Sequence, residues 1–158
     1  ILVLGKALSG GLYPVSAVLA NNHIMNVITP GSHGSTFGGN PIAAAVAMAA
    51  LEVVNEEQLA ENAERLGTIF RDELNNYIKN SHLVKLVRGK GLLNAIVIND
   101  HEQSDTAWEI CLKLRDNGLL AKPTHGNIIR FAPPLVMTED ELRDCVNIII
   151  KTLKTFDR

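Results

Sequence analysis

The sequence has little cysteine, few aromatic residues and no excess of basic charge. Only Cys111 and Cys145 occur in 158 residues, which excludes a disulfide-bonded framework and favours a reduced, intracellular setting. Fifteen Lys and Arg stand against seventeen Asp and Glu. A surface without basic excess argues against nucleic acid or an acidic membrane as a partner. Hydrophobic residues make up 46% of the chain, enough for the core of one ordinary domain.

Charge is almost missing from the first third of the chain. Among residues 1–51, the only Asp, Glu, Lys or Arg is Lys6. Glycines and prolines interrupt this span, so it holds no run of about 18 apolar residues that could cross a membrane. An uncharged, glycine-rich segment is typical of a buried sheet, an active-site wall or a subunit interface, because ions are costly there.

The chain begins inside an apolar run. Ile1–Leu4 is typical of a strand buried on both faces of a parallel sheet, and Ile1 is not a methionine. We therefore expect the C-terminal part of a longer polypeptide, with any targeting segment upstream. Residues 1–54 are expected to end a large domain, and residues 55–158 to form a small α+β domain with helices on a largely antiparallel sheet.

Periodicity and capping residues predict the elements. Helices are expected at 41–54, 55–77, 104–117 and 138–156, and strands at 15–20, 83–87, 92–98 and 128–132. Asn40 with Pro41, Asn55 with Gln58, Ser104, and Thr138 with Glu141 are the predicted helix starts. The segment Arg88–Gly91 is predicted to be a solvated hairpin turn.

Lys6 is the first candidate for chemistry. It directly follows the first predicted strand, at the edge where open α/β sheets bind their ligands. Among uncharged residues its amine is expected to be desolvated, which favours the neutral, nucleophilic form that a Schiff-base lysine requires. A lysine whose stem is buried while its amine reaches water explains the position as well.

Two other places could bind anions. Ser35 and Thr36 lie between glycines just before a predicted helix, where hydroxyls, backbone N–H groups and the helix dipole could converge on a phosphate. A flexible glycine loop with an ordinary cap is an equal alternative. Arg130, on a short strand before Pro133-Pro134, suits a carboxylate, although most strand arginines only cover a sheet edge. The histidines and acids show no metal-ligand spacing.

Taken together, these segments resemble the class III, pyridoxal-phosphate-dependent aminotransferases. Leu4–Val18 resembles the lysine motif of the family, and His33–Pro41 its phosphate-contact motif. Three further segments, Arg88–Ala95, Leu114–Gly126 and Ile129–Leu135, are similar to those members of the family that use ornithine. The resemblance runs in order over nearly the whole chain, so it favours the chemical interpretation of each candidate.

The resemblance implies a fold-type-I α/β transferase that moves the δ-amino group of ornithine to a 2-oxo acid, giving glutamate semialdehyde. Lys6 would hold the cofactor, pyridoxal 5′-phosphate, and then move the substrate proton. Ser35 and Thr36 would contact the cofactor phosphate across the interface of a homodimer, and Arg130 would bind a substrate carboxylate. Residues 1–54 would then end the cofactor-binding domain with an interdomain helix.

Two departures limit this expectation. Phe37 replaces the tyrosine usual in the ornithine-using members, which removes a hydroxyl near the phosphate. The chain also lacks the phosphate loop, the ring-stacking aromatic residue and the aspartate of the family, so alone it is not expected to catalyse. Alternatives are a family member that uses acetylornithine or 4-aminobutyrate, or a binding and assembly fragment without activity. The expected compartment is the cytoplasm or the mitochondrial matrix.

Overall fold

The computed structural model describes residues 1–157, and the chain divides into two compact units, Ile1–Gln58 and Leu59–Arg158. The boundary predicted between residues 54 and 55 falls inside helix α2 (Pro41–Glu56), which ends just before the second unit begins. Within the described residues, every helix is too short or too polar to span a lipid bilayer.

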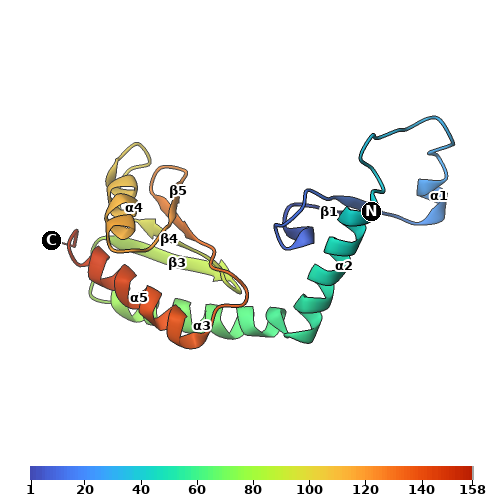
Figure 1. Ribbon diagram of the computed structural model, residues 1–158. Helices are drawn as coiled ribbons and strands as arrows, with labels where there is room; N and C mark the ends of the chain where they lie inside the picture. Colours follow the sequence, from blue (N-terminus) through green and yellow to red (C-terminus); the bar gives the residue numbers. More distant parts are fainter. Residues whose placement is uncertain (158) are drawn as a thin grey trace. The chain divides into compact units, whose positions relative to one another are not determined.

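The first unit holds a small sheet and one long helix (Figure 1). Strand β1 (Leu2–Leu4) pairs antiparallel with β2 (Ala17–Leu19), so that Leu2 lies opposite Leu19. Between them lies a short 3-10 helix, η1 (Lys6–Ser9), and after them a single helical turn, α1 (Asn22–Met25). Helix η1 packs against α2.

The predicted first strand exists, but its predicted surroundings are wrong. It is antiparallel to its neighbour and mostly exposed, with Val3 70% exposed. Its sheet consists of β1 and β2 in the described part of the chain, and Leu2, Val18 and Leu19 are exposed on it as well.

Helix α2 begins as predicted. The side-chain oxygen of Asn40 accepts a hydrogen bond from the backbone N–H of Ala43 at 2.9 Å, and Pro41 occupies the first turn, where its missing N–H is harmless. The capping box predicted at Asn55 is wrong, because α2 continues through that residue. The chain then turns at Gln58, whose φ is +50°.

The second unit is the predicted α+β domain (Figure 1). Its elements are α3 (Leu59–Ile78), β3 (Val84–Lys90), β4 (Leu93–Ile98), α4 (Thr106–Asp116), β5 (Lys122–Thr124), β6 (Ile128–Phe131) and α5 (Glu139–Leu153). The strands lie in the order β3-β4-β6-β5, and all neighbours are antiparallel. Strand β5 was not predicted, since it is a short edge strand that contains Pro123.

One core holds this unit together. Buried residues of α3, α4 and α5 pack with the inward face of the sheet, and the rings of Phe70 and Phe131 lie 5.5 Å apart, centre to centre. On β6, Ile129 and Phe131 are buried while Arg130 is exposed. This strand therefore has the period-two alternation of a half-buried sheet, which directs Arg130 away from the core.

The β3–β4 hairpin is tighter than predicted. Arg88 pairs with Ala95 and Lys90 with Leu93, so both basic residues lie in the strand and the turn is Gly91-Leu92. Helix α3 stabilises this turn, because Arg71 donates from Nη1 to the Gly91 carbonyl and to Oδ1 of buried Asn94, each at 3.1 Å. This contact spans 20 residues of sequence, which local turn preferences cannot reveal.

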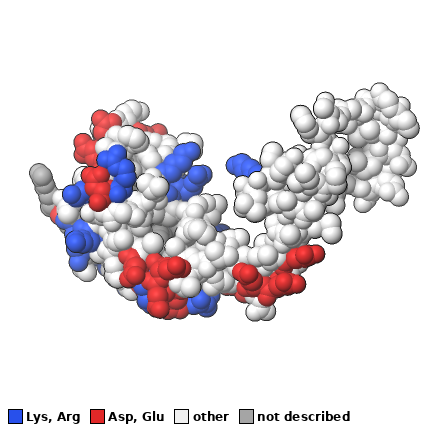
Figure 2. Space-filling model, in the orientation of Figure 1, with Lys and Arg blue, Asp and Glu red and all other residues white. Residues whose placement is uncertain are grey.

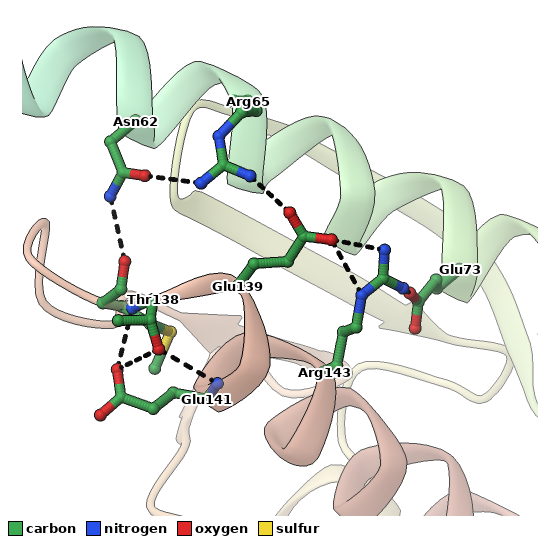
Figure 3. A network of polar contacts seen from close by, with 8 residues as sticks. Asn62, Arg65, Glu73, Thr138, Glu139, Glu141 and Arg143 are labelled. Atoms are coloured by element: carbon green, nitrogen blue, oxygen red, sulfur yellow. Dashed lines mark hydrogen bonds and ion pairs between the residues drawn. The ribbon is translucent and has the colours of Figure 1, made fainter.

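The two last helices differ in how well their starts were predicted. The capping box of α5 is confirmed, with the Thr138 N–H donating to Glu141 at 2.8 Å. The cap predicted at Ser104 is wrong, since Asp105 occupies the N-cap position of α4. Figure 3 shows how α5 is joined to α3: Glu139 binds Arg65 at 2.5 Å, and Arg143, which Glu139 of the same helix binds at 2.7 Å, forms an ion pair with Glu73.

Candidate functional site

Lys6 is held in an unusual backbone conformation. It opens η1 directly after β1, and its φ of +52° lies in the left-handed region that residues other than glycine rarely adopt. Such strain persists only where neighbouring structure enforces it, and it is concentrated at functional sites. Lys6 is the only charged side chain before Glu52, and Figure 2 shows this part of the chain otherwise uncoloured.

Ser9 anchors the end of the 3-10 helix that Lys6 opens. Its side chain is fully buried, and its hydroxyl donates to the Tyr13 carbonyl and accepts from the Tyr13 N–H at 3.1 Å. Gly10 ends η1 with a φ of +65° and lies against Ala50 of α2. Ser9 was not singled out from the sequence. The sequence contains one indication of its role: Ser9 directly precedes two glycines, and a hydroxyl beside glycines often hydrogen-bonds to the backbone of a nearby turn.

The amine of Lys6 is not desolvated in this chain, contrary to the prediction. Lys6 is exposed, because neither the two-stranded sheet nor α2 covers its side chain. The position after a strand is confirmed, whereas the burial that a run of uncharged residues predicted is not found within the described residues.

Ser35 and Thr36 lie in an exposed loop that leads into α2. The hydroxyl of Ser35 accepts from the Gly38 N–H at 3.0 Å, and the side-chain amide of Asn40 donates to the Phe37 carbonyl at 3.1 Å. A Cβ at Gly38 would lie 2.9 Å from that of Ser35, so glycine is required there. The loop is therefore ordered by its own hydrogen bonds before the helix begins.

The Lys6 turn and the Ser35–Thr36 loop lie at different places along α2. Gly10 touches Ala50, whereas the loop directly precedes Pro41. At 1.5 Å per residue these two points are about 14 Å apart along the helix axis. The structure thus places both groups on one scaffold without bringing them around a single pocket.

Arg130 belongs to the second unit. It lies on the exposed face of β6, opposite Ala95 on one side and Lys122 on the other. Within residues 1–157 its guanidinium forms no ion pair. The guanidinium of an arginine on a sheet face can bind a carboxylate through two parallel N–H···O hydrogen bonds.

Each group of the first unit suits one end of a cofactor that carries a carbonyl and a phosphate. Lys6 offers a primary amine to the carbonyl. The Ser35 and Thr36 hydroxyls precede a helix of 16 residues, whose N-terminus favours a phosphate through its free N–H groups and dipole.

Comparison with known proteins identifies the family of the chain. A model of the family described as aminotransferase class-III matches residues 1–153. The mitochondrial ornithine aminotransferase of Drosophila melanogaster is 63% identical over 153 residues, which cover 97% of this chain and 34% of that protein. The corresponding protein of Rattus norvegicus is 63% identical over 156 residues, covering 99% and 35%. The chain spans about a third of the length of these curated relatives.

Solved structures agree with this assignment. An acetylornithine aminotransferase from Elizabethkingia anophelis superposes with a TM-score of 0.94 at 68% identity, over 98% of this chain and 38% of that one. The ornithine δ-aminotransferase of Plasmodium falciparum gives a TM-score of 0.91 at 50% identity, over 98% and 40%. The predicted α/β aminotransferase fold is thereby confirmed. With its family match over nearly all residues, the chain belongs to the class-III aminotransferases.

Proposed function

We propose that the chain is the lysine-bearing part of an ornithine aminotransferase, which transfers the δ-amino group of ornithine to a 2-oxo acid and produces glutamate semialdehyde. The observation that carries the proposal is the left-handed conformation of Lys6, which opens η1 within the segment that resembles the lysine motif of the family. The names of the fly and rat relatives support ornithine as the amino donor.

Pyridoxal 5′-phosphate, when bound, supplies a carbonyl that condenses with amines and a ring that withdraws electrons from the substrate carbon. Lys6 holds the cofactor through Nζ. Once free of the cofactor, the amine of Lys6 would accept the proton of the substrate carbon as the general base. The strained backbone keeps this amine at the end of β1, so one side chain serves as anchor and as general base.

Ser35 and Thr36 donate hydrogen bonds to the cofactor phosphate. Their distance along α2 from the Lys6 turn supports a homodimer in which each loop serves the site of the partner subunit. Arg130 binds a substrate carboxylate. In this proposal, residues 1–54 end the cofactor-binding domain, and residues 55–158 form the small C-terminal domain.

The compartment follows from the relatives. Both the fly and the rat protein are named mitochondrial. We place the protein in the mitochondrial matrix or the cytoplasm, where the two cysteines stay reduced.

One observation favours acetylornithine as an alternative amino donor. The Elizabethkingia structure, 68% identical, is described as an acetylornithine aminotransferase. Arg130 could bind the carboxylate of ornithine, acetylornithine or 4-aminobutyrate alike, so the described residues do not discriminate among them.

Turnover decides between these donors. With the full-length protein and 2-oxoglutarate, we expect kcat/KM for ornithine to exceed that for N-acetylornithine and for 4-aminobutyrate by at least about tenfold, a transition-state difference of roughly 1.4 kcal/mol. Equal or better activity on either alternative would refute ornithine as the donor.

A separate experiment tests Lys6. Borohydride reduction of the full-length protein should fix the cofactor to Lys6, as identified by peptide mapping. We expect Lys6→Ala to lower kcat by at least about 100-fold, the lower range for losing a general base. Lys151→Ala, on the exposed surface of α5, serves as the control. Label on another lysine would exclude the assigned role, and the absence of any bound cofactor would favour a fragment without activity.

A further inference from the structure

The sheet of the second unit has a one-sided charge. The segments 81–99 and 118–138, which contain all four strands, hold no Asp or Glu. Their basic residues are Lys85, Arg88, Lys90, Lys122 and Arg130. The acids of this unit lie on the helices and their connections instead, for example Glu73 and Glu139.

Strand register lines up three of these cations. Arg88 pairs with Ala95, Ala95 with Arg130, and Arg130 with Lys122, so the row crosses β3, β4, β6 and β5. Directly paired residues share one face of a sheet, and here it is the exposed face, since Ile129 and Phe131 point to the core. We call Arg88, Arg130 and Lys122 the cation row.

The spacing of the cation row suits small anions. Neighbouring strands lie about 4.8 Å apart, so Lys122 is adjacent to Arg130 and Arg88 lies about 10 Å from it. Between the two arginines stands Ala95, whose single methyl group leaves room above the sheet. Figure 2 shows blue side chains gathered where Figure 1 draws β5.

The row has no internal counter-charge. Within residues 1–157, none of its three side chains forms an ion pair, whereas the neighbouring Lys90 binds Glu64 at 3.0 Å. Like charges directly opposite one another destabilise a sheet, and Lys122 lies directly opposite Arg130. An anionic ligand would remove this repulsion.

We propose that Arg88 and Lys122 are positioning residues that attract and orient the dicarboxylic 2-oxo acid substrate towards Arg130. This inference rests on the proposed function. A substrate with two carboxylates gains more from the row than any other reactant, whereas ornithine, with one carboxylate and a net charge of +1, gains least. The row therefore discriminates between the amino acceptor and the amino donor by charge.

Opposite shifts in KM test this inference in the full-length enzyme. For Arg88→Gln and Lys122→Gln we expect KM for 2-oxoglutarate to rise about threefold to tenfold, while kcat stays within about twofold. The KM for ornithine should stay constant or fall. High salt should shrink the difference from wild type, because exposed charges are screened within about 3 Å at 1 M.

The matched control is Lys113→Gln. It removes the same charge from an exposed position of α4, a helix that packs on the core face of the sheet. A rise of KM for both substrates alike, or shifts no larger than those of the control, would overturn the inference.

A wild type without aminotransferase activity would refute the proposed function and not the cation row. In that case, calorimetric titration with glutarate, an unreactive dicarboxylate, tests whether the cation row binds dicarboxylates. Weaker binding by Arg88→Gln and Lys122→Gln than by Lys113→Gln supports the row, and equal binding by all three overturns it.

Discussion

The two units of the chain handle their apolar residues in opposite ways. Among the buried hydrophobic residues in the described range 1–157, only Ala43 belongs to the first unit, and all others lie from Leu59 onward. Helix α2 is apolar around most of its circumference, yet Ile42, Met48 and Leu51 are exposed. A helix that is hydrophobic on every side is normally a buried one. Composition therefore indicates which segment is apolar enough to require burial, but not whether neighbouring residues of the same unit cover it.

Separating the two units gives the largest expected effect. Residues 59–158 expressed alone should unfold cooperatively in urea, with a slope of about 1 kcal/mol/M, because the whole core cluster lies within them. Residues 1–58 alone should show no cooperative transition, since their fully buried side chains are few. Far-UV circular dichroism against urea concentration measures both, and a sharp transition in residues 1–58 would remove the contrast.

Much of the second unit was predictable, because its helices each turn one face to its own core. The apolar spacing of α3 and α5 predicts the buried residues Leu66, Phe70, Val146 and Ile149. Alternation on β6 likewise predicts the exposed side of Arg130. Local pattern and tertiary environment agree in these elements, so reasoning from the sequence succeeds.

The misses lie where a distant contact decides the local structure. The Gly91-Leu92 turn depends on Arg71, and the pairing of β5 gives Pro123 a place at the sheet edge. The exposure of β1 depends on what packs on its sheet, which the apolar run Ile1–Leu4 does not indicate.

The candidate site was predictable in part. Lys6, Ser35, Thr36 and Arg130 follow from their surroundings in sequence together with the family resemblance. The left-handed φ of Lys6 and the supporting bonds of Ser9 do not, because they arise from the three-dimensional turn.

A matched pair of phenylalanines sharpens the comparison between the units. Phe70 is 3% exposed and stacks near Phe131, whereas Phe37 is 80% exposed. We expect Phe70→Ala to lower the free energy of unfolding by about 3–5 kcal/mol, through lost burial and the cavity left behind. Phe37→Ala should change it by less than about 0.5 kcal/mol. Urea titration of the 158-residue chain compares the two, and similar losses would mean that Phe37 is covered in solution.

The smallest expected effect concerns acid and the start of α5. Thr138→Ala removes the hydroxyl that accepts from the Glu141 N–H, and should lower the free energy of unfolding by about 1 kcal/mol at pH 7. Thr138→Ser keeps that hydroxyl and is the control, expected to remain near wild type.

Acid should reduce this difference, because the same cap binds a carboxylate. Hydrogen bonds from the Thr138 backbone N–H and hydroxyl lower the pKa of Glu141 below its usual range. A folded-state pKa below the unfolded value, which is about 4.3 for glutamate, gives stability that is present at neutral pH and lost as pH falls through the folded pKa. The advantage of wild type over Thr138→Ala should therefore decline below about pH 4 in urea titrations repeated at each pH. An advantage that stays constant down to pH 2 would show that the Glu141 charge adds nothing to the cap.

The first unit has no carboxylate before Glu52, so the same titration should leave its β1–β2 sheet unaffected. A pH-dependent change in that sheet would contradict the expected difference between the two units.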